Sequence, residues 1–117
     1  MKKILVAEDN DSNFILMTYI LRKFYSYERA KNGKEAVDMV EDGAYDMVLM
    51  DIKMPIMDGL EATKAIKEKH PDLPIIALTA NAFDSDRQLA VQAGCSDFLA
   101  KPVSSDPCIK TIRKFLD

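Results

Sequence analysis

The chain alternates between short apolar runs and longer segments whose apolar residues recur at helical spacing. The apolar runs are partly β-branched and bounded by turn residues, which is typical of buried strands. We expect strands at residues 3–7, 27–30, 46–50, 74–78 and 97–100. Phe14, Met17, Leu21 and Phe24 recur at helical intervals and predict the inward face of a first helix. Further helices are expected at 34–42, 60–69 and 84–93, the last two closed by residues 70–71 and Gly94.

A fifth helix is expected after Asp106, which is an N-cap candidate with Pro107 at the first helical position. The result is five strand–helix pairs in succession, joined by short connections. Such alternation predicts an α/β fold with one doubly wound parallel sheet and helices on both faces. The length of 117 residues fits a single domain spanning residues 1–117.

Polar residues follow the strands at the edge where parallel strands end together. Glu8 and Asp9 follow the first strand, Asp51 the third, Thr79 the fourth and Lys101 the fifth. Carboxylates that converge repel one another unless a cation neutralises them, and oxygen ligands without His or Cys suit Mg²⁺. A lysine and a hydroxyl nearby are suited to the oxygens of a phosphoryl group.

These residues resemble the CheY-like receiver domains of two-component response regulators over the whole chain. The resemblance implies a flavodoxin-like fold with strand order 2-1-3-4-5, and a domain that is phosphorylated but is not an enzyme turning over an external substrate. The motifs that carry it are Val6-Ala7-Glu8-Asp9-Asn10, Leu49-Met50-Asp51-Ile52-Lys53-Met54-Pro55-Ile56-Met57-Asp58-Gly59, Ala77-Leu78-Thr79-Ala80 and Phe98-Leu99-Ala100-Lys101-Pro102.

The resemblance also implies a role for each acidic residue. Asp51 is expected to accept a phosphoryl group from a phosphohistidine on a histidine kinase or a histidine phosphotransfer domain. Asp9 is expected to bind Mg²⁺ directly, Glu8 to act through water, and Lys53 to supply its backbone carbonyl to the metal. We expect the side chains of Lys53 and Asn81 to stand at the mouth of the site.

Further roles follow from the same resemblance. Lys101 is expected to pair with the phosphate, with a cis bond to Pro102, while Thr79 and Phe98 form a switch that reports phosphorylation. The surface of the fourth helix, fifth strand and fifth helix is expected to bind an output domain or a second receiver.

Two other phosphate-handling classes conflict with the sequence. Phosphatases that form an aspartyl phosphate resemble Asp-x-Asp after the first strand, whereas Asp51 follows the third strand and Lys53 stands two residues later. Flavodoxin-like binders have a phosphate loop rich in Ser, Thr and Gly after the first strand, where this chain has repelling acids. A phosphate-independent interaction module with the receiver fold stays open as an alternative.

Composition narrows the partners. The formal net charge is −3, from 16 basic and 19 acidic residues, and the basic excess typical of nucleic-acid-binding domains is missing. Apolar runs such as residues 4–7 predict no membrane span, and Cys95 and Cys108 are expected to be reduced, so we expect a cytoplasmic protein without direct membrane contact. The resemblance of Asn10, Asn13 and residues 80–82 to hybrid sensor kinase receivers favours a phosphorelay receiver or one excised from a larger protein.

Overall fold

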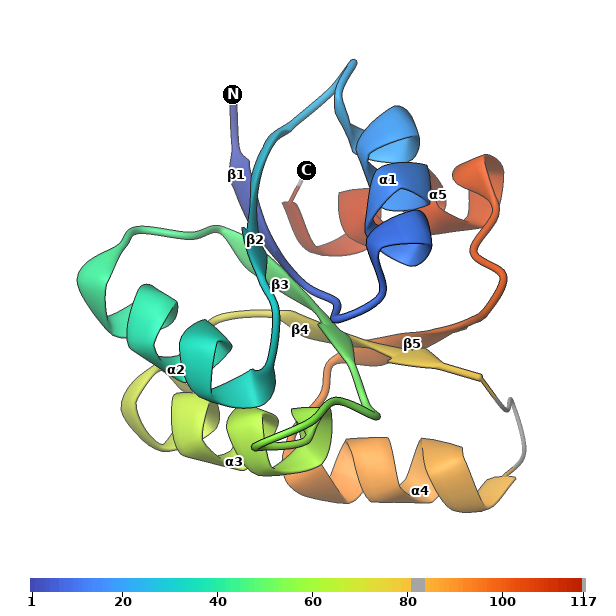
Figure 1. Ribbon diagram of the computed structural model, residues 1–117. Helices are drawn as coiled ribbons and strands as arrows, with labels where there is room; N and C mark the ends of the chain where they lie inside the picture. The colour runs from blue at the N-terminus through green and yellow to red at the C-terminus, as the bar shows by residue number, and fades with distance from the viewer. Residues whose placement is uncertain (81–83, 117) are drawn as a thin grey trace.

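The computed structural model describes residues 1–80 and 84–116, and its strands form one parallel sheet between two layers of helices (Figure 1). The strand order is β2-β1-β3-β4-β5, which confirms the predicted topology. The strands are β1 (Lys3–Ala7), β2 (Ser26–Ala30), β3 (Met47–Asp51), β4 (Ile75–Thr79) and β5 (Asp97–Ala100). The helices are α1 (Asp11–Leu21), α2 (Gly33–Asp42), α3 (Gly59–Lys69), α4 (Asp84–Ala93) and α5 (Ser105–Leu116).

The central strands feed two separate hydrophobic cores. On β1, Ile4 and Val6 pack in the core shared with α1 and α5, whereas Leu5 and Ala7 pack in the core shared with α2 and α3. Successive side chains of a strand point to opposite faces, so a strand covered on both sides must be apolar at every position. Figure 1 shows this arrangement, with α1 and α5 on one face and α2, α3 and α4 on the other.

Short polar residues and one glycine set the helix ends. Asn10, Asn32 and Asp58 cap α1, α2 and α3, each accepting a hydrogen bond from the backbone N–H three residues further on at 2.8–2.9 Å. Gly94 follows α4 with a φ of 107°, a left-handed conformation that favours glycine. Among the described residues, no helix has the length and apolar character needed to cross a bilayer.

The prediction that Asp106 caps the fifth helix is wrong by two residues. α5 already begins at Ser105, and the Cys108 N–H donates to the Ser104 carbonyl at 3.2 Å. Asp106 and Pro107 therefore lie inside the first turn. Proline is tolerated there because the first N–H groups of a helix have no intrahelical acceptor.

The prediction that Phe24 lies on the inward face of the first helix is also wrong. α1 ends at Leu21, and the N–H groups of both Phe24 and Tyr25 donate to the Leu21 carbonyl at 2.9 Å. This turn leaves Phe24 47% exposed and brings Tyr25, 6% exposed, into the core. The guanidinium of Arg113 on α5 lies over the Phe24 ring, 5.4 Å from its centroid.

Candidate functional site

The strand ends place the predicted site residues at one edge of the sheet. β3 and β4 each begin and end one residue later than predicted, so Asp51 and Thr79 are the last residues of their strands. Asp51 is in register with Leu78, and Thr79 with Ala100. Glu8 directly follows β1, and Lys101 directly follows β5. The pairing of these four parallel strands therefore fixes the backbone positions of the four site residues at one edge of the sheet.

Lys101 bridges two of the carboxylates. Its Nζ atom lies 2.9 Å from Glu8 Oε1 and 3.0 Å from Asp51 Oδ2. The contact with Glu8 Oε1 is an ion pair without hydrogen-bond geometry. The Lys101–Pro102 bond is cis, as the resemblance implies. Burial alone lowers the pKa of Lys101, but its contacts with Glu8 and Asp51 outweigh burial, so the pKa is raised and the ammonium stays charged.

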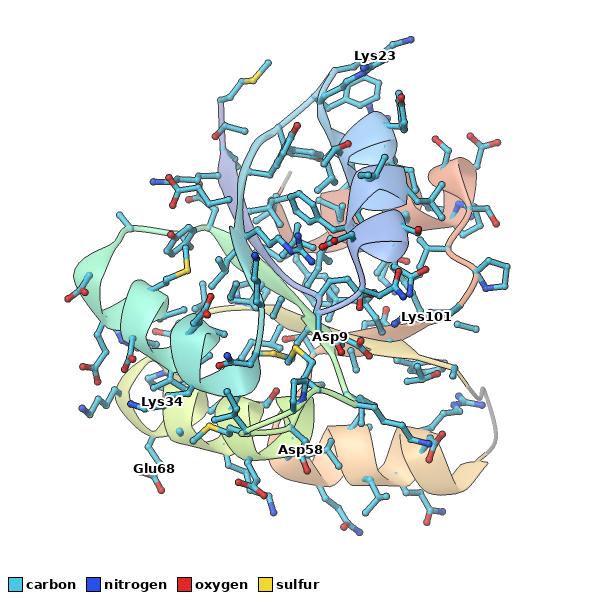
Figure 2. All side chains as sticks on the ribbon, viewed as in Figure 1. Asp9, Lys23, Lys34, Asp58, Glu68 and Lys101 are labelled. Carbon is cyan, nitrogen blue, oxygen red and sulfur yellow. The ribbon has the colours of Figure 1, made fainter. Side chains whose placement is uncertain are left out.

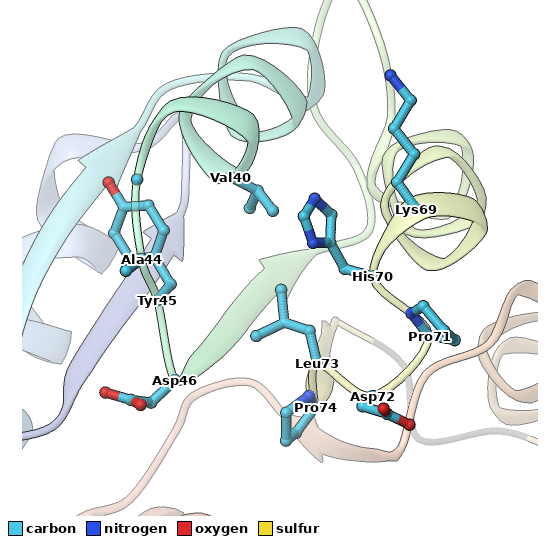
Figure 3. A pocket seen from close by; sticks show the side chains of 11 residues that line it. Val40, Ala44, Tyr45, Asp46, Lys69, His70, Pro71, Asp72, Leu73 and Pro74 are labelled. Carbon is cyan, nitrogen blue, oxygen red and sulfur yellow. The ribbon is translucent and has the colours of Figure 1, made fainter.

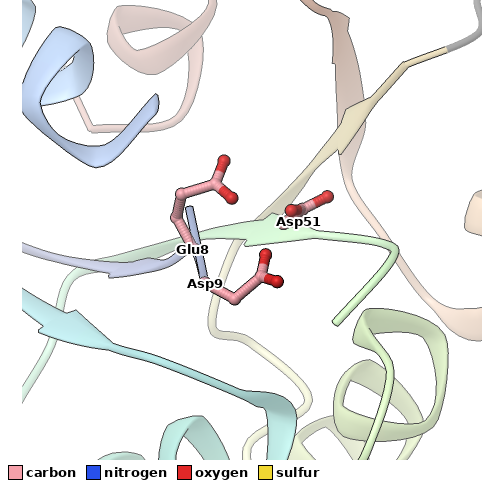
Figure 4. Close-up of side chains that lie close together, drawn as sticks. All are labelled: Glu8, Asp9 and Asp51. Carbon is pink, nitrogen blue, oxygen red and sulfur yellow. The ribbon is translucent and has the colours of Figure 1, made fainter. Parts of the chain in front are cut away.

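Three carboxylates converge beside this lysine. Glu8, Asp9 and Asp51 each offer an oxygen, and these oxygens lie within 4.8 Å of one another (Figure 4). Glu8 is buried, Asp51 is buried, and Asp9 is exposed. Figure 2 shows Asp9 and Lys101 at the same edge of the sheet.

Burial, and then the neighbouring Asp51, raise the pKa of Glu8 to about 7 against the opposing effect of Lys101. The fold holds these three carboxylates close together although their negative charges repel one another. Its donors are carboxylate oxygens alone, which suits a hard divalent cation such as Mg²⁺. The site can therefore hold a metal ion.

A pocket of about 220 Å³ opens over the cluster. The predicted Thr79, 2% exposed, and Lys53 contribute to its wall. The Lys53 N–H donates to Asp51 Oδ1 at 3.3 Å, which ties the loop after β3 to the carboxylate. Asn81, expected at the mouth, lies outside the described residues. The full lining is Glu8, Asp9, Asn10, Asn13, Asp51, Ile52, Lys53, Leu78, Thr79, Ala80, Asp86 and Lys101.

Gly59 is the glycine on which the Asp51 loop depends. A Cβ atom at this position would lie 2.0 Å from the Asp51 carbonyl oxygen, and the Gly59 N–H donates to the Ile52 carbonyl at 2.8 Å. The start of α3 is thereby held against the end of β3. In the same loop Ile56 has a φ of 70° and is exposed, which is a strained conformation for a β-branched residue.

Arg29 supports the site in a way that the sequence did not indicate. Its Nε donates to the Glu8 carbonyl at 3.0 Å, and its Nη1 pairs with Asp11 at 2.9 Å. The guanidinium also lies 4.7 Å from the Phe14 ring centroid. Arg29 comes from β2, so only the register of β2 against β1 could have revealed that it fixes the loop after β1.

Asp86 is a second residue that sequence reasoning missed. It lies in the first turns of α4 and contributes to the pocket wall. Nothing in the local sequence separates it from other acidic residues near helix starts. The orientation of α4 relative to the strand ends decides that it reaches the site.

Phe98 of β5 is half-buried and does not line the pocket. The guanidinium of Arg87 lies 4.6 Å from its ring centroid. Arg87 and Phe98 border a groove of about 460 Å³ on the α4–β5 surface, together with Gln88, Val91 and Gln92. On the neighbouring α5, Lys114 pairs with Asp97 at 2.7 Å. The predicted output surface thus carries an aromatic side chain held by a cation.

A separate pocket of about 500 Å³ lies at the other ends of β3 and β4 (Figure 3). Tyr45, His70 and Leu73 are among the side chains that line it. His70 stands at the end of α3, where its N–H donates to the Ile66 carbonyl at 2.8 Å. The single histidine of the chain is therefore remote from the acidic cluster.

Comparisons with known proteins agree with this geometry. The model of the response regulator receiver domain family matches residues 4–113. The chain belongs to this family. As a receiver domain it is 36% identical over 118 residues to the polar-differentiation response regulator DivK of Brucella anthropi, covering 98% of this chain and 96% of DivK. It is 42% identical over 132 residues to hybrid signal transduction histidine kinase B of Dictyostelium discoideum, covering 100% of this chain but only 7% of that kinase.

Solved receiver domains have the same fold. The receiver domain of a Pseudomonas aeruginosa sensor histidine kinase, which has a magnesium ion coordinated in its active site cleft, is 36% identical, with a TM-score of 0.92 over 98% of this chain and 97% of that one. The receiver domain of Saccharomyces cerevisiae Ssk1, crystallised with the histidine phosphotransfer protein Ypd1, is 33% identical, with a TM-score of 0.92 over 98% and 88%. The predicted fold and receiver function in two-component phosphorelay signalling are therefore confirmed.

Proposed function

We propose that this receiver domain accepts a phosphoryl group on Asp51 from the phosphohistidine of a histidine kinase or of a histidine phosphotransfer domain. The observation that carries the proposal is the position of Asp51, whose carboxylate lies 3.0 Å from the Lys101 ammonium at the base of an open pocket. Glu8 also contacts Lys101 and lines this pocket, but its side chain is only 1% exposed, whereas the Asp51 side chain is 8% exposed and is the more open to an incoming group.

The transfer is a displacement at phosphorus. A carboxylate oxygen of Asp51 forms the new P–O bond while the P–N bond to the donor imidazole breaks. The imidazole keeps the electron pair of the P–N bond and leaves as a neutral ring when one of its two nitrogens carries a proton. Lys101 places a positive charge beside the oxygens of the transferring group. Thr79 supplies a hydroxyl from the end of β4. The work of the site is positioning and electrostatic stabilisation.

The residues present fit a bound Mg²⁺. Glu8, Asp9 and Asp51 would hold it, together with the backbone carbonyl of Lys53. The ion would neutralise the negative charge of the phosphoryl oxygens. Burial, and then the neighbouring Asp51, disfavour the charged form of Glu8, and a bound divalent cation would favour that form, which supports a metal site here.

Phosphorylation adds charge and acceptor oxygens at one point, and we propose that Thr79 and Phe98 convert this into an output signal. The hydroxyl of Thr79 would move to bond a phosphoryl oxygen, which leaves room for Phe98 to turn inward. The half-buried Phe98 beside the α4–β5 groove supports this assignment. The α4–β5–α5 surface would then bind an output domain or a second receiver.

The donor protein and the cellular location of the domain are part of this proposal. The complex of Ypd1 with the receiver domain of Ssk1 supports a histidine phosphotransfer protein as one donor class. A cytoplasmic location is consistent with Cys95 and Cys108, which are both free thiols. The domain would promote its own phosphorylation and dephosphorylation without turning over an external substrate.

A labelling experiment tests the proposal. The chain is incubated with a small acyl phosphate donor, with Mg²⁺ or with excess chelator, and the intact mass is measured. The wild type should gain one phosphoryl group only when Mg²⁺ is present, and Asp51→Asn should gain none. Asp46→Asn, at the other end of β3, is the matched control and should label normally. Labelling of Asp51→Asn would refute the assignment, and an unlabelled wild type would favour a phosphate-independent interaction module.

A further inference from the structure

α4 adds a carboxylate to the phosphoacceptor pocket. Asp86 is half-buried and lines the pocket of about 220 Å³ that holds Asp51. It also lines an adjoining groove of about 550 Å³, which includes Lys53 and extends to Leu89 on α4. Asp86 therefore lines both the pocket that holds Asp51 and the groove beside it.

Asp86 is not one of the converging ligands. Among the described residues, the oxygens that come within 4.8 Å of one another belong to Glu8, Asp9 and Asp51. Its contribution to the site is therefore its charge. The pocket wall carries four carboxylates and two ammonium groups, so the side chains sum to an excess of negative charge before any ligand binds.

This excess acts oppositely on the two ligands of the site. A nearby carboxylate attracts a divalent cation. It repels a phosphoryl group on Asp51, because phosphorylation adds negative charge there. Asp86 also lies near the N-terminal end of α4, where its charge offsets the positive end of the helix dipole that would otherwise favour an anion.

We propose that Asp86 strengthens Mg²⁺ binding and shortens the lifetime of phosphorylated Asp51 through its charge. The inference rests on Asp51 being the phosphoacceptor. In hydrolysis a water oxygen bonds to phosphorus, the P–O bond to Asp51 breaks, and the products are the Asp51 carboxylate, inorganic phosphate and a proton released to solvent. In a loose transition state charge moves from the phosphoryl oxygens to the leaving carboxylate, so a fixed negative charge beside those oxygens destabilises the ground state more than the transition state.

The test uses three variants of the full chain. Asp86→Asn removes the charge and keeps the shape, Asp86→Glu keeps the charge, and Asp106→Asn removes a carboxylate from the first turn of α5, away from the pocket. Mg²⁺ affinity is measured by titration calorimetry on the unphosphorylated chain. The lifetime is measured by intact mass after the donor is removed, at saturating Mg²⁺.

Asp86→Asn should weaken Mg²⁺ binding and lengthen the phosphorylated lifetime, each roughly two- to five-fold. Both effects should shrink at high salt, because salt screens the charge. Asp86→Glu and Asp106→Asn should stay near the wild type in both measurements. A longer lifetime with unchanged Mg²⁺ affinity would overturn the proposal in favour of a contact with the attacking water. A wild-type lifetime in Asp86→Asn overturns this inference alone, whereas a wild type that is never labelled on Asp51 overturns the proposed function as well.

Discussion

Glu8 should make the chain less stable as the pH rises in the absence of a metal ion. Burial, and then the neighbouring Asp51, raise the pKa of Glu8 from 4.5 to about 7 in the folded state. The folded state therefore binds a proton at Glu8 more tightly than the unfolded state does. By linkage, the free energy of unfolding must fall as the pH rises between these two values, and it levels off above them.

The magnitude follows from the size of the pKa shift. A pKa difference between 4.5 and about 7 corresponds to a loss of on the order of 3 kcal/mol in the free energy of unfolding. Because the Glu8 side chain is 1% exposed, solvent does little to screen this effect. The loss belongs to the coupled group of Glu8, Asp51 and Lys101, since Lys101 offsets part of the repulsion.

Urea unfolding at about pH 5 and about pH 8, in chelator, measures this loss. Glu8→Gln has no titrating group at this position, so the wild type should lose stability relative to Glu8→Gln as the pH rises. Glu68→Gln is the matched control, because Glu68 is an exposed glutamate on α3 and should follow the wild type. A difference between the wild type and Glu8→Gln that is flat, or that grows in the other direction, would refute the reasoning.

Mg²⁺ should oppose this loss of stability at high pH. Bound cation stabilises the folded state by mass action, and protons compete with it for the Glu8 carboxylate. The stabilisation of the wild type by a fixed Mg²⁺ concentration should therefore be larger at about pH 8 than at about pH 5. The same addition should stabilise Glu8→Gln with little dependence on pH in this range.

Two further substitutions test how the loops hold the site. Gly59→Ala should lower the free energy of unfolding by roughly 1–3 kcal/mol and impair Asp51 labelling, because the new Cβ would meet the Asp51 carbonyl oxygen at 2.0 Å. The control in the same unfolding and mass assays is Gly43→Ala, because a Cβ there would first meet the ring of the Tyr45 side chain. Arg29→Lys should weaken Mg²⁺ binding several-fold, roughly 1 kcal/mol, by releasing the carbonyl of the acidic loop. Arg22→Lys removes an exposed arginine that also covers an aromatic ring, and an equal loss of affinity there would contradict a specific role for Arg29.

The sequence predicts the fold and the core of the site because both depend on strands that are short, apolar and followed by polar residues. Once parallel strands are assigned, the edge at which Glu8, Asp51 and Lys101 gather follows from topology alone. Their mutual contacts then follow from opposite charge in a small space. The predicted β3 and β4 end one residue early because Asp51 and Thr79 are polar, while the strand ladder continues to include them.

The residues that sequence reasoning missed depend on tertiary geometry. Arg29 reaches the loop after β1 because of the register between β2 and β1, and Asp86 reaches the pocket because of how α4 is rotated on the sheet. Phe24 fits the helical spacing of its neighbours, but the helix ends before it and Tyr25 fills the core instead. Spacing along the chain does not report where a helix ends or which face it turns to a distant loop.

The acidic cluster is easier to understand as a site prepared for ligands than as part of a stable core. Apolar packing could fill the space under Glu8 at lower electrostatic cost, yet the chain holds three carboxylates against one ammonium there. The repulsion is fixed by β1 and β3, whose backbones cannot move apart without breaking the sheet. A divalent cation relieves it, and a phosphoryl group then meets charges that are already in place. Burial and the neighbouring Asp51 make the charged form of Glu8 costly in the apo chain, and a bound cation offsets part of that cost. The pH dependence of unfolding and the affinity for Mg²⁺ should therefore change together in variants of this cluster.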